Sequence, residues 1–504
     1  MLVREHYLET KKLLNNIKPR VVGRWLLNDG YFPEEYVLPP SFKAGGIKLN
    51  REPYFDNLNN LKEKEIVNVS YPKTSLTHRI FGIQHPKFYH DMVYWLVKDW
   101  QLVVNHLFND ETKIFTYSLP IPVTKTEELS LSPIRSGRMI YEWIEMAERD
   151  LIVDAVNYSY LVRTDITNFY ASIYTHSIPW ALHDKNMSRN DKEYTLLGNK
   201  LDRLLQYSND KKTNGISVGS ALSDLIAEII LSKVDRDVSL KLKDIDFVGV
   251  RFKDDYRILC NSESDAKKVL KNISDELNKY NLNINESKTK INKLPNGLYR
   301  EHSKKYYPYS LSGAESFSFR EFEQAALKAL DIHYEYPGTS ILNKFISELT
   351  KKDRLKIIFS KDKAKQLKEI KKLISLLFMI KRESEKVMGN VLAIIDLIFL
   401  EHKKSHPEIK DFIKGIIVDD VKRSSAKDSV FDVLWLVFFT KFRQFGMGDV
   451  SKYVDSVLIN GNKFYQCLVN NKPIFIDDKY TLFKKPKDLN EIMLIEYVDL
   501  FKRD

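Results

Sequence analysis

The sequence predicts an α+β core followed by a helical C-terminal region. Two observations predict the core: a β-hairpin pattern over 246–260, and an apolar strand over 160–164 that runs into an aspartate. A third observation, a series of segments with helical spacing after about residue 315, predicts the C-terminal region. With 504 residues, of which 43% are hydrophobic, the chain can bury several cores.

The hairpin pattern centres on two adjacent aspartates. Val248, Val250 and Phe252 alternate with residues of the other face, and the alternation resumes after a short polar break. Such runs on both sides of a break predict two strands and a turn, with Asp254 and Asp255 at the turn. Because their mutual repulsion must be offset, the pair indicates either a solvated acidic turn or a site for divalent cations. Oxygen ligands favour Mg²⁺ or Mn²⁺.

Another aspartate ends the strand predicted over 160–164. The apolar residues lead into Asp165, and the aromatic residues after it begin a helical pattern. In α/β architectures, side chains at strand ends converge on a catalytic edge. Asp165 therefore indicates either a catalytic carboxylate or the cap of the following helix.

Two glycines precede a helix between these aspartate segments. Gly215 and Gly219 permit close approach of the backbone to a flat ligand, and they suit a plain loop equally well. The following apolar residues have the spacing of a buried helical face: Leu222, Leu225, Ile226, Ile229 and Ile230.

After the hairpin, the sequence predicts a further helix and an extended segment. A capping pattern at 262–265 opens the helix, whose apolar positions run from Ala266 to Tyr280. The chain then reaches 282–289, an extended piece that ends in a polar turn with Lys288. Each piece is ordinary by itself, and the signal lies in their order.

Basic residues outnumber acidic ones, with 79 Lys and Arg against 68 Asp and Glu. This excess suits a polyanionic partner. Arg135 and Arg138 lie in a basic turn before a helix, which indicates either a triphosphate contact or a solvated loop. The window 351–386 holds 13 Lys and Arg against five Asp and Glu, which indicates a solvated helix face or a surface that follows a phosphate backbone.

Cysteine usage and hydropathy bear on location. The chain has only Cys260 and Cys467, which excludes a disulfide framework and fits a reducing compartment. The first residues lack the apolar core of a signal peptide, and the longest apolar runs are too short to span a bilayer. We therefore expect a cytoplasmic protein without a membrane partner.

The C-terminal segments with helical spacing follow one another through short links. This arrangement favours a bundle or a solenoid of stacked helix pairs. The predicted helices cover 319–330, 340–349, 364–380, 387–400, 409–418 and 430–442.

The order of the core motifs resembles the palm of a reverse transcriptase. Asp165 matches the first catalytic aspartate, 215–223 the glycine motif, 252–255 the acidic pair and 285–289 the motif that follows. The resemblance covers about residues 130–295. The acidic motif departs from the usual pattern by a phenylalanine in place of tyrosine and by a lysine before the aspartates, but neither removes a metal ligand.

A narrower resemblance lies just after the first aspartate. The run 174–180 and the layout of a polymerase core before a helical region are similar to abortive-infection reverse transcriptases, which protect bacteria against phage. This resemblance implies fingers over about 1–158, a palm over about 159–310, and an all-α, HEAT-like domain over 311–504. It also implies untemplated DNA synthesis, priming on a protein side chain and assembly into homo-oligomers.

The resemblance assigns roles to individual residues. Two Mg²⁺ ions would be held by Asp165, Asp254 and Asp255, with the backbone carbonyl of Ile166. Tyr170 takes the position of the aromatic residue that excludes a ribose 2′-hydroxyl, which implies dNTP substrates; the alternative is a core tyrosine. Lys288 is either a proton donor to pyrophosphate or a surface lysine. The implied nucleotide contacts are Tyr170, Gly215, Gly219, Arg135 and Arg138.

Three functions stay open on the sequence. The first is an untemplated, protein-primed DNA polymerase whose product stays covalently attached to the protein. The second is a template-copying, RNA-directed DNA polymerase. The third is a non-catalytic nucleic-acid-binding protein with a palm fold, against which the three aspartates argue. The sequence offers 27 tyrosines and does not select a priming residue.

Overall fold

The computed structural model describes the whole chain except residues 1, 75–76, 124–130, 132–141, 144, 352–353, 444, 446–449, 476–479, 490 and 499–504. Contacts between residues divide the chain into two compact units. Unit 1 comprises 1–33, 44–68 and 82–299, and unit 2 comprises 34–43, 69–81 and 300–504. The predicted limits of the fingers, palm and C-terminal domain stay a prediction.

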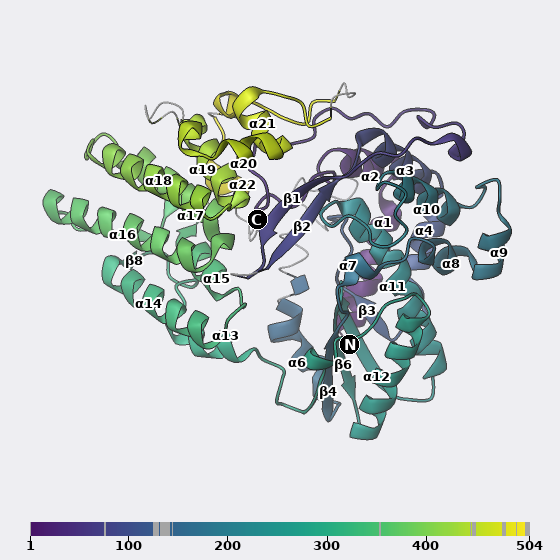
Figure 1. The fold of residues 1–504 in the computed structure, drawn as a ribbon. Helices are drawn as coiled ribbons and strands as arrows, with labels where there is room; N and C mark the ends of the chain where they lie inside the picture. Colours follow the sequence, from purple (N-terminus) through teal and green to yellow (C-terminus); the bar gives the residue numbers. More distant parts are fainter. Residues whose placement is uncertain are drawn as a thin grey trace. The chain divides into compact units, whose positions relative to one another are not determined.

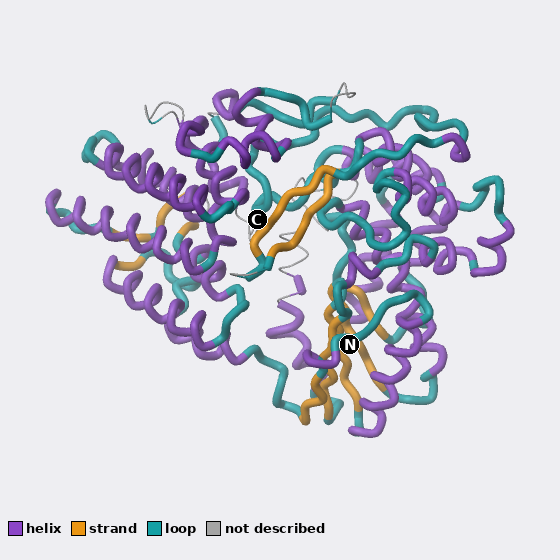
Figure 2. Tube along the Cα trace, viewed as in Figure 1, coloured by secondary structure: helices purple, strands orange, loops and turns teal. Residues whose placement is uncertain are grey.

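Unit 1 contains a five-stranded sheet with the strand order β3-β5-β6-β4-β7 (Figures 1 and 2). β3 runs parallel to β5, and the other neighbouring strands are antiparallel. β5 and β6 form the predicted hairpin, which the structure confirms. The strands are β3 Ile114–Thr116, β4 Tyr160–Asp165, β5 Phe247–Phe252, β6 Asp255–Cys260 and β7 Lys290–Lys293.

Two long helices, α11 Ala221–Lys241 and α12 Glu263–Asn278, cover one face of this sheet (Figure 1). The side chain of Ser220 caps α11 by accepting a hydrogen bond from the backbone N–H of Ser223. The predicted apolar face of α11 is confirmed, because Leu222, Leu225, Ile226, Ile229 and Ile230 are all fully buried.

Shorter helices make up most of the rest of unit 1. They are α1 Leu2–Asn16, α2 Pro19–Leu27, α3 Pro86–Lys98, α4 Trp100–Leu107, α6 Leu151–Ala155, α7 Phe169–Ser172, α8 Ser177–His183, α9 Lys185–Asn190 and α10 Leu197–Tyr207. A separate two-stranded sheet pairs β1 Val67–Pro72 with β2 His78–Ile83 (Figure 2), and the segment 69–81 within it belongs to unit 2.

Helices dominate unit 2, and the six helices predicted there are confirmed. The helices are α13 Glu301–Tyr306, α14 Phe319–Glu335, α15 Ile341–Ser347, α16 Lys363–Glu383, α17 Met388–His402, α18 Ile409–Ala426, α19 Val430–Arg443, α20 Ser456–Gly461, α21 Lys463–Asn470 and α22 Leu494–Val498. Whether they form HEAT-like repeats stays a prediction.

The expectation of an entirely helical C-terminal region needs one correction. β8 Phe317–Ser318 pairs with β11 Ile357–Ile358, and β9 Thr350–Lys351 pairs with β10 Arg354–Leu355. Strands of two residues are too short to show the period-2 alternation by which strands are found in a sequence. The fold is therefore mixed α and β, with helix predominant in unit 2.

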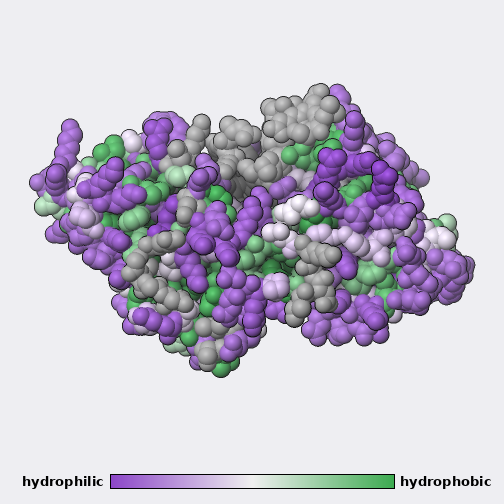
Figure 3. Space-filling model, turned by 90° about the horizontal axis from the view of Figure 1, so that it is seen from above, coloured by the Kyte–Doolittle hydropathy of each residue, from purple (hydrophilic) through white to green (hydrophobic). Residues whose placement is uncertain are grey.

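Hydrophilic side chains cover most of the face drawn in Figure 3, with smaller hydrophobic areas between them. Among the described residues, no helix combines the length and the apolar character that a membrane span needs.

Candidate active site

The strand pairing brings the first aspartate beside the acidic pair. Asp165 is the last residue of β4, and its Cα partner on the neighbouring antiparallel strand is Asp255, the first residue of β6. Directly opposed residues of antiparallel strands point to the same face of the sheet. Asp254 lies in the turn between β5 and β6, and its carbonyl accepts a hydrogen bond from the backbone N–H of Ile166 at 3.1 Å. The three predicted carboxylate residues thus meet at one edge of the sheet.

The two carboxylate oxygens of Asp165 have different surroundings. Oδ2 forms an ion pair with the ammonium of Lys288. Oδ1 is buried and has no hydrogen-bond partner among the described residues. A buried carboxylate oxygen without a partner is costly in a folded protein, so Oδ1 is available to a cation. The Lys288 side chain is 63% exposed, so its ammonium reaches Asp165 from the solvent side.

The motif at 285–289 is tied to the end of β4 by backbone and side-chain contacts. The backbone N–H of Asn285 donates to the carbonyl of Asp165 at 2.7 Å. The hydroxyls of Thr164 and Thr289 are hydrogen-bonded at 2.7 Å. These contacts hold Lys288 beside Asp165, where sequence order alone leaves them 123 residues apart.

Tyr170 contacts the hairpin turn through an aspartate on α11. Its hydroxyl donates to Asp224 Oδ1 at 2.5 Å, and the ammonium of Lys253 lies 3.2 Å from Asp224 Oδ2. Burial, followed by the charge of Asp224 and then that of Asp254, raises the pKa of Tyr170 well above its ordinary value. The tyrosine therefore stays protonated and is held in place by Asp224, which is 4% exposed.

The predicted glycine turn has the backbone that glycine permits. Gly215 has φ +83° and Gly219 has φ +125°, a region that side chains with a Cβ rarely adopt. The N–H of Gly215 donates to the carbonyl of Ile173 at 2.8 Å, and the N–H of Ile216 donates to the carbonyl of Tyr170 at 3.0 Å. The turn is thus attached to the segment that carries Tyr170. A nucleotide contact of either glycine stays a prediction.

A buried ionic network that the sequence analysis missed lies next to the hairpin turn. Arg251 of β5 is fully buried and binds both oxygens of Glu228, at 2.8 and 3.1 Å, and Asp235 Oδ2 at 2.8 Å. Both acidic residues lie on α11. Tyr256 of β6 donates to Asp235 at 3.1 Å, and Thr116 of β3 donates to Glu228 at 2.8 Å. The network joins α11 to three strands of the sheet.

Arg251 also reaches the backbone of the turn itself. Its Nη1 donates to the carbonyl of Lys253 at 3.2 Å. Lys253 has φ +52°, which is unfavourable for a residue with a side chain. Such a conformation persists when surrounding contacts impose it. The bond from Arg251 to the carbonyl and the ion pair of the Lys253 ammonium with Asp224 both restrain the residue that precedes Asp254.

Phe252, the residue before Lys253, stands where the reverse transcriptase motif usually has a tyrosine. The ring of Phe252 stacks against Trp143, with 5.5 Å between ring centroids and 20° between ring planes. The residue is therefore a packing contact of the hairpin, a role that phenylalanine fills without a hydroxyl.

The described residues fit a divalent cation in chemistry but do not present a complete metal cluster. Carboxylate oxygens are the ligands that Mg²⁺ prefers, and Asp165 Oδ1 is a buried oxygen to which no described residue forms a hydrogen bond. In the part of the chain that the structure describes, no three His, Cys, Asp or Glu side chains gather closely enough to hold a metal ion. Metal ligation by Asp165, Ile166, Asp254 and Asp255 stays a prediction.

The run 174–180 forms an aromatic cluster near the glycine turn. The ring of Tyr174 lies 4.8 Å from that of His176 and 5.7 Å from that of Trp180, measured between centroids. His176 Nδ1 is 2.5 Å from Asp202 Oδ2, which raises the pKa of the imidazole. Tyr174 also bridges to Asn214 of the glycine segment. These contacts give the run a structural role.

The remaining predicted site residues, Arg135 and Arg138, lie outside the described residues. Conversely, the structure adds Asp224, Glu228, Asp235 and Arg251 to the residues around the hairpin. A signal for the buried network was present in the sequence, because Glu228 and Asp235 are charged positions within the apolar pattern of α11.

Comparison with known proteins adds to this geometry. Residues 101–328 match the family model described as reverse transcriptase (RNA-dependent DNA polymerase). This segment is a reverse transcriptase domain. It contains Asp165, the glycine turn, the acidic hairpin and the motif at 285–289, so the motif order that suggested the resemblance falls inside the match.

Solved structures of low identity are also similar to the chain. Telomerase from Candida albicans in complex with a TWJ fragment of telomeric RNA has 13% identity and a TM-score of 0.30, over 70% of this chain and 64% of that chain. Apo telomerase from Candida tropicalis has 13% identity and a TM-score of 0.33, over 80% and 65%. The chain thus spans less than two thirds of the length of each. No curated protein matches the chain.

Proposed function

We propose that this protein is a reverse-transcriptase-type DNA polymerase that joins dNTPs without a template, uses one of its own side chains as primer, and acts against phage. The observation that supports polymerase chemistry is the pairing of Asp165 with Asp255, beside Asp254, inside a reverse transcriptase domain. The untemplated, protein-primed and antiviral parts of the proposal draw their support from the resemblance of the run 174–180 and of the layout of the chain.

The three aspartates would hold two Mg²⁺ ions. Oδ1 of Asp165, which has no hydrogen-bond partner in the part of the chain that the structure describes, suits one of them. Bound there, the ions would lower the pKa of the attacking hydroxyl and neutralise charge on the triphosphate. The existing ion pair between Lys288 and Asp165 balances one carboxylate charge when no cation is bound.

Residues around the aspartates would position the nucleotide and move protons. The exposed ammonium of Lys288 carries protons and would donate one to the departing pyrophosphate. Asp224 holds the hydroxyl of Tyr170 in one place, so the ring would form a fixed barrier against a ribose 2′-hydroxyl and select dNTPs.

A second candidate is copying of an RNA template, and the description of the matching family model favours it because it names RNA-dependent DNA synthesis. Both candidates share the same carboxylates and the same chemistry. They differ in whether a template determines the order of bases in the product. Sequencing of the product therefore distinguishes them.

The experiment that tests the proposal uses purified protein with labelled dNTPs and Mg²⁺, without primer or template. We expect label that stays with the protein on a denaturing gel and that is lost in Asp254→Asn and Asp255→Asn variants. Asp244→Asn is the matched control, because Asp244 is an exposed aspartate that precedes β5. Sequencing of the product after digestion of the protein would show a composition unrelated to any nucleic acid in the reaction.

Each other outcome has a defined meaning. Incorporation that requires an added RNA and reproduces its complement favours the template-copying function. Binding of nucleic acid that weakens with salt, with no incorporation under any primer, template or metal condition, indicates a non-catalytic palm protein. For the antiviral part, cells that express the wild type should form fewer phage plaques than cells that express Asp254→Asn. Sedimentation of the purified protein measures the proposed homo-oligomer.

A further inference from the structure

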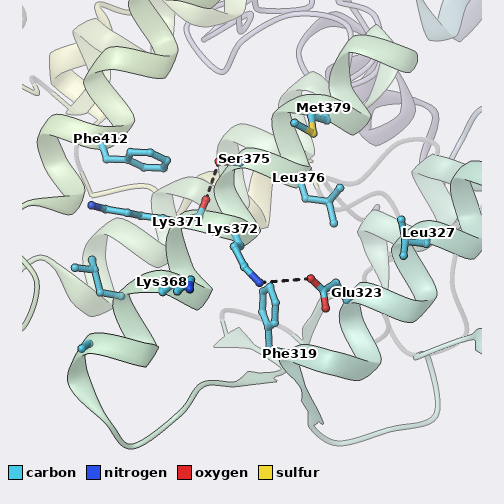
Figure 4. Close-up of a pocket in the computed structure, with 12 residues that line it drawn as sticks. Phe319, Glu323, Leu327, Lys368, Lys371, Lys372, Ser375, Leu376, Met379 and Phe412 are labelled. Carbon is cyan, nitrogen blue, oxygen red and sulfur yellow. Dashed lines mark hydrogen bonds and ion pairs between the residues drawn. The ribbon is translucent and has the colours of Figure 1, made fainter.

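Unit 2 contains an open groove of about 680 Å³ on its helical surface. Phe319, Glu323 and Leu327 of α14 line one side, a stripe of α16 lies in the middle, and Phe412 of α18 lies on the side of α16 opposite α14 (Figure 4). All of these residues belong to one compact unit. Asp165, Asp254 and Asp255 belong to unit 1.

α16 presents two different stripes along its length. One stripe, with Ile370, Leu373, Ile374 and Leu377, is fully buried in the core of unit 2. The other stripe lines the groove and repeats at the spacing of a second helical face. Its members are Ala364, Leu367, Lys368, Lys371, Lys372, Ser375, Leu376 and Met379. Four of these eight residues are apolar and three are lysines, so the second stripe is a mixed apolar and basic face.

Two apolar side chains of this groove are more than half exposed. Leu327 is 57% exposed and Met379 is 55% exposed. Single exposed apolar residues are common on protein surfaces, and here Leu327 and Met379 line the same groove, as apolar residues do in ligand-binding grooves. Grooves lined by leucine, methionine and phenylalanine are the form that binds the apolar face of an amphipathic helix.

The charged residues that line the groove indicate the charge of the partner. Three lysines line it, whereas Glu323 is the one carboxylate among its lining residues, 4.0 Å from the Lys372 ammonium. The ammonium of Lys371 lies 5.4 Å from the ring centroid of Phe412, and that of Lys372 lies 5.8 Å from that of Phe319. The positive charge left over favours an acidic partner.

The same contacts disfavour single-stranded nucleic acid as the occupant. Such binding sites use open aromatic faces on which bases stack. Phe319 is only 9% exposed, and lysine ammonium groups lie near both phenylalanine rings. The large apolar side chains that the groove exposes most, Leu327 and Met379, are not aromatic.

From these observations, we propose that the groove between α14, α16 and α18 binds an acidic amphipathic helix of a partner protein. The lined part of α16 runs from residue 364 to residue 379, about 22 Å along the helix axis. It therefore accommodates about four helical turns, with apolar residues against Leu327, Leu376 and Met379 and carboxylates beside Lys368 and Lys371.

The test is a selection of displayed random peptides of about 15 residues on the full-length protein, with counter-selection on a Lys368→Glu/Lys371→Glu variant. We expect enrichment of sequences with Leu, Ile, Met or Phe at helical spacing and Glu or Asp between them. A labelled synthetic copy of an enriched peptide should bind the double variant at least tenfold more weakly in fluorescence anisotropy. Leu327→Asp, which changes the apolar side without touching a lysine, should weaken binding as well.

The matched control is Lys365→Glu, an exposed lysine of α16 outside the groove lining, which should leave peptide affinity unchanged. Thermal unfolding of each variant confirms that the unit is folded. No enrichment over the counter-selected variant, or enriched peptides without acidic residues, would overturn the proposal. Binding of a labelled single-stranded oligonucleotide in the groove would also overturn the proposal. Such binding would be lost in both the double variant and Leu327→Asp.

Discussion

Each unit contains a buried cluster in which one cation lies between two carboxylates. In the hairpin cluster, Arg251 binds Glu228 and Asp235. In the helical cluster, Lys381 of α16 binds Asp420 of α18, at 2.7 Å, and Asp432 of α19. The cation and carboxylate side chains of both clusters are at most 4% exposed.

The two clusters differ in what the cation holds besides the carboxylates. Arg251 extends a further bond to the carbonyl of Lys253, the residue before Asp254. Lys381 joins side chains of three helices. A buried ion pair by itself is weak evidence for function, because its desolvation cost can equal its attraction. The contact with the strained turn is therefore what links the hairpin cluster to the site. The guanidinium group permits this contact because it supplies several donors at once.

The largest expected effect comes from Arg251→Met. This variant leaves two buried carboxylates without their cation and should lower the free energy of unfolding by about 3 to 5 kcal/mol, as urea titration would measure. It should also reduce dNTP incorporation per folded molecule, because the turn loses a restraint. Arg251→Lys keeps the charge but not the fork of donors, and should recover part of both quantities. Wild-type incorporation by either folded variant would remove the link between cluster and site.

Lys381→Met should lower stability about as much as Arg251→Met does, but it should not lower dNTP incorporation. Asp432 then loses its cation and Asp420 keeps only Arg382, at 3.9 Å, so we expect a decrease in unfolding free energy of about 3 kcal/mol. Incorporation per folded molecule should stay at the wild-type rate. Lys365→Met, at an exposed position of the same helix, should change stability by less than about 1 kcal/mol. A fall in incorporation as large as that of Arg251→Met would erase the contrast between the clusters.

The carboxylates of both clusters predict how stability changes with pH. Burial raises the pKa of Asp235 to about 6 and that of Asp432 to about 7, although the neighbouring cation opposes each shift. The unfolded value is about 3.9. The native state therefore binds more protons between these values, and the contribution of both groups to stability falls as the pH rises from about 4 through 6 and 7.

The change of unfolding free energy with pH distinguishes the two clusters. Between pH 6 and 7, the Asp432 carboxyl loses its proton in the folded protein but is already ionised in the unfolded chain. Asp432→Asn should therefore reduce the fall in unfolding free energy over this range by about 1 kcal/mol. Asp411→Asn, an exposed aspartate of α18, is the control and should keep the wild-type slope. An unchanged slope in Asp432→Asn would show that the group does not titrate in this window.

The smallest effects are expected at Tyr170. Its hydroxyl is bound to Asp224, which also restrains the turn through its ion pair with Lys253. Tyr170→Phe removes the bond to Asp224 and leaves the ring, so it should change stability by about 1 kcal/mol and keep the preference for dNTPs. Tyr170→Ala should admit ribonucleotides, with a loss of discrimination on the order of tenfold in kcat/KM. Unchanged discrimination in Tyr170→Ala would refute the role of the ring as a barrier.

Much of the fold could be predicted because the signals were local. The alternation around Asp254 gave the hairpin, the apolar spacing after Ser220 gave α11, and the pattern from Ala266 gave α12. The position of Asp165 at a strand end was likewise readable from neighbouring residues. Two-residue strands such as β9 and β10 left no periodic signal and were missed.

The sequence by itself determined the elements and the order of the motifs, because side-chain period and turn chemistry act over a few residues. Only the tertiary structure decided which charges meet. Arg251 and Glu228 are 23 residues apart, and Lys288 and Asp165 are 123 apart. Nothing in either local pattern selects these partners. They are chosen when burial removes water and each buried charge requires an opposite charge within reach.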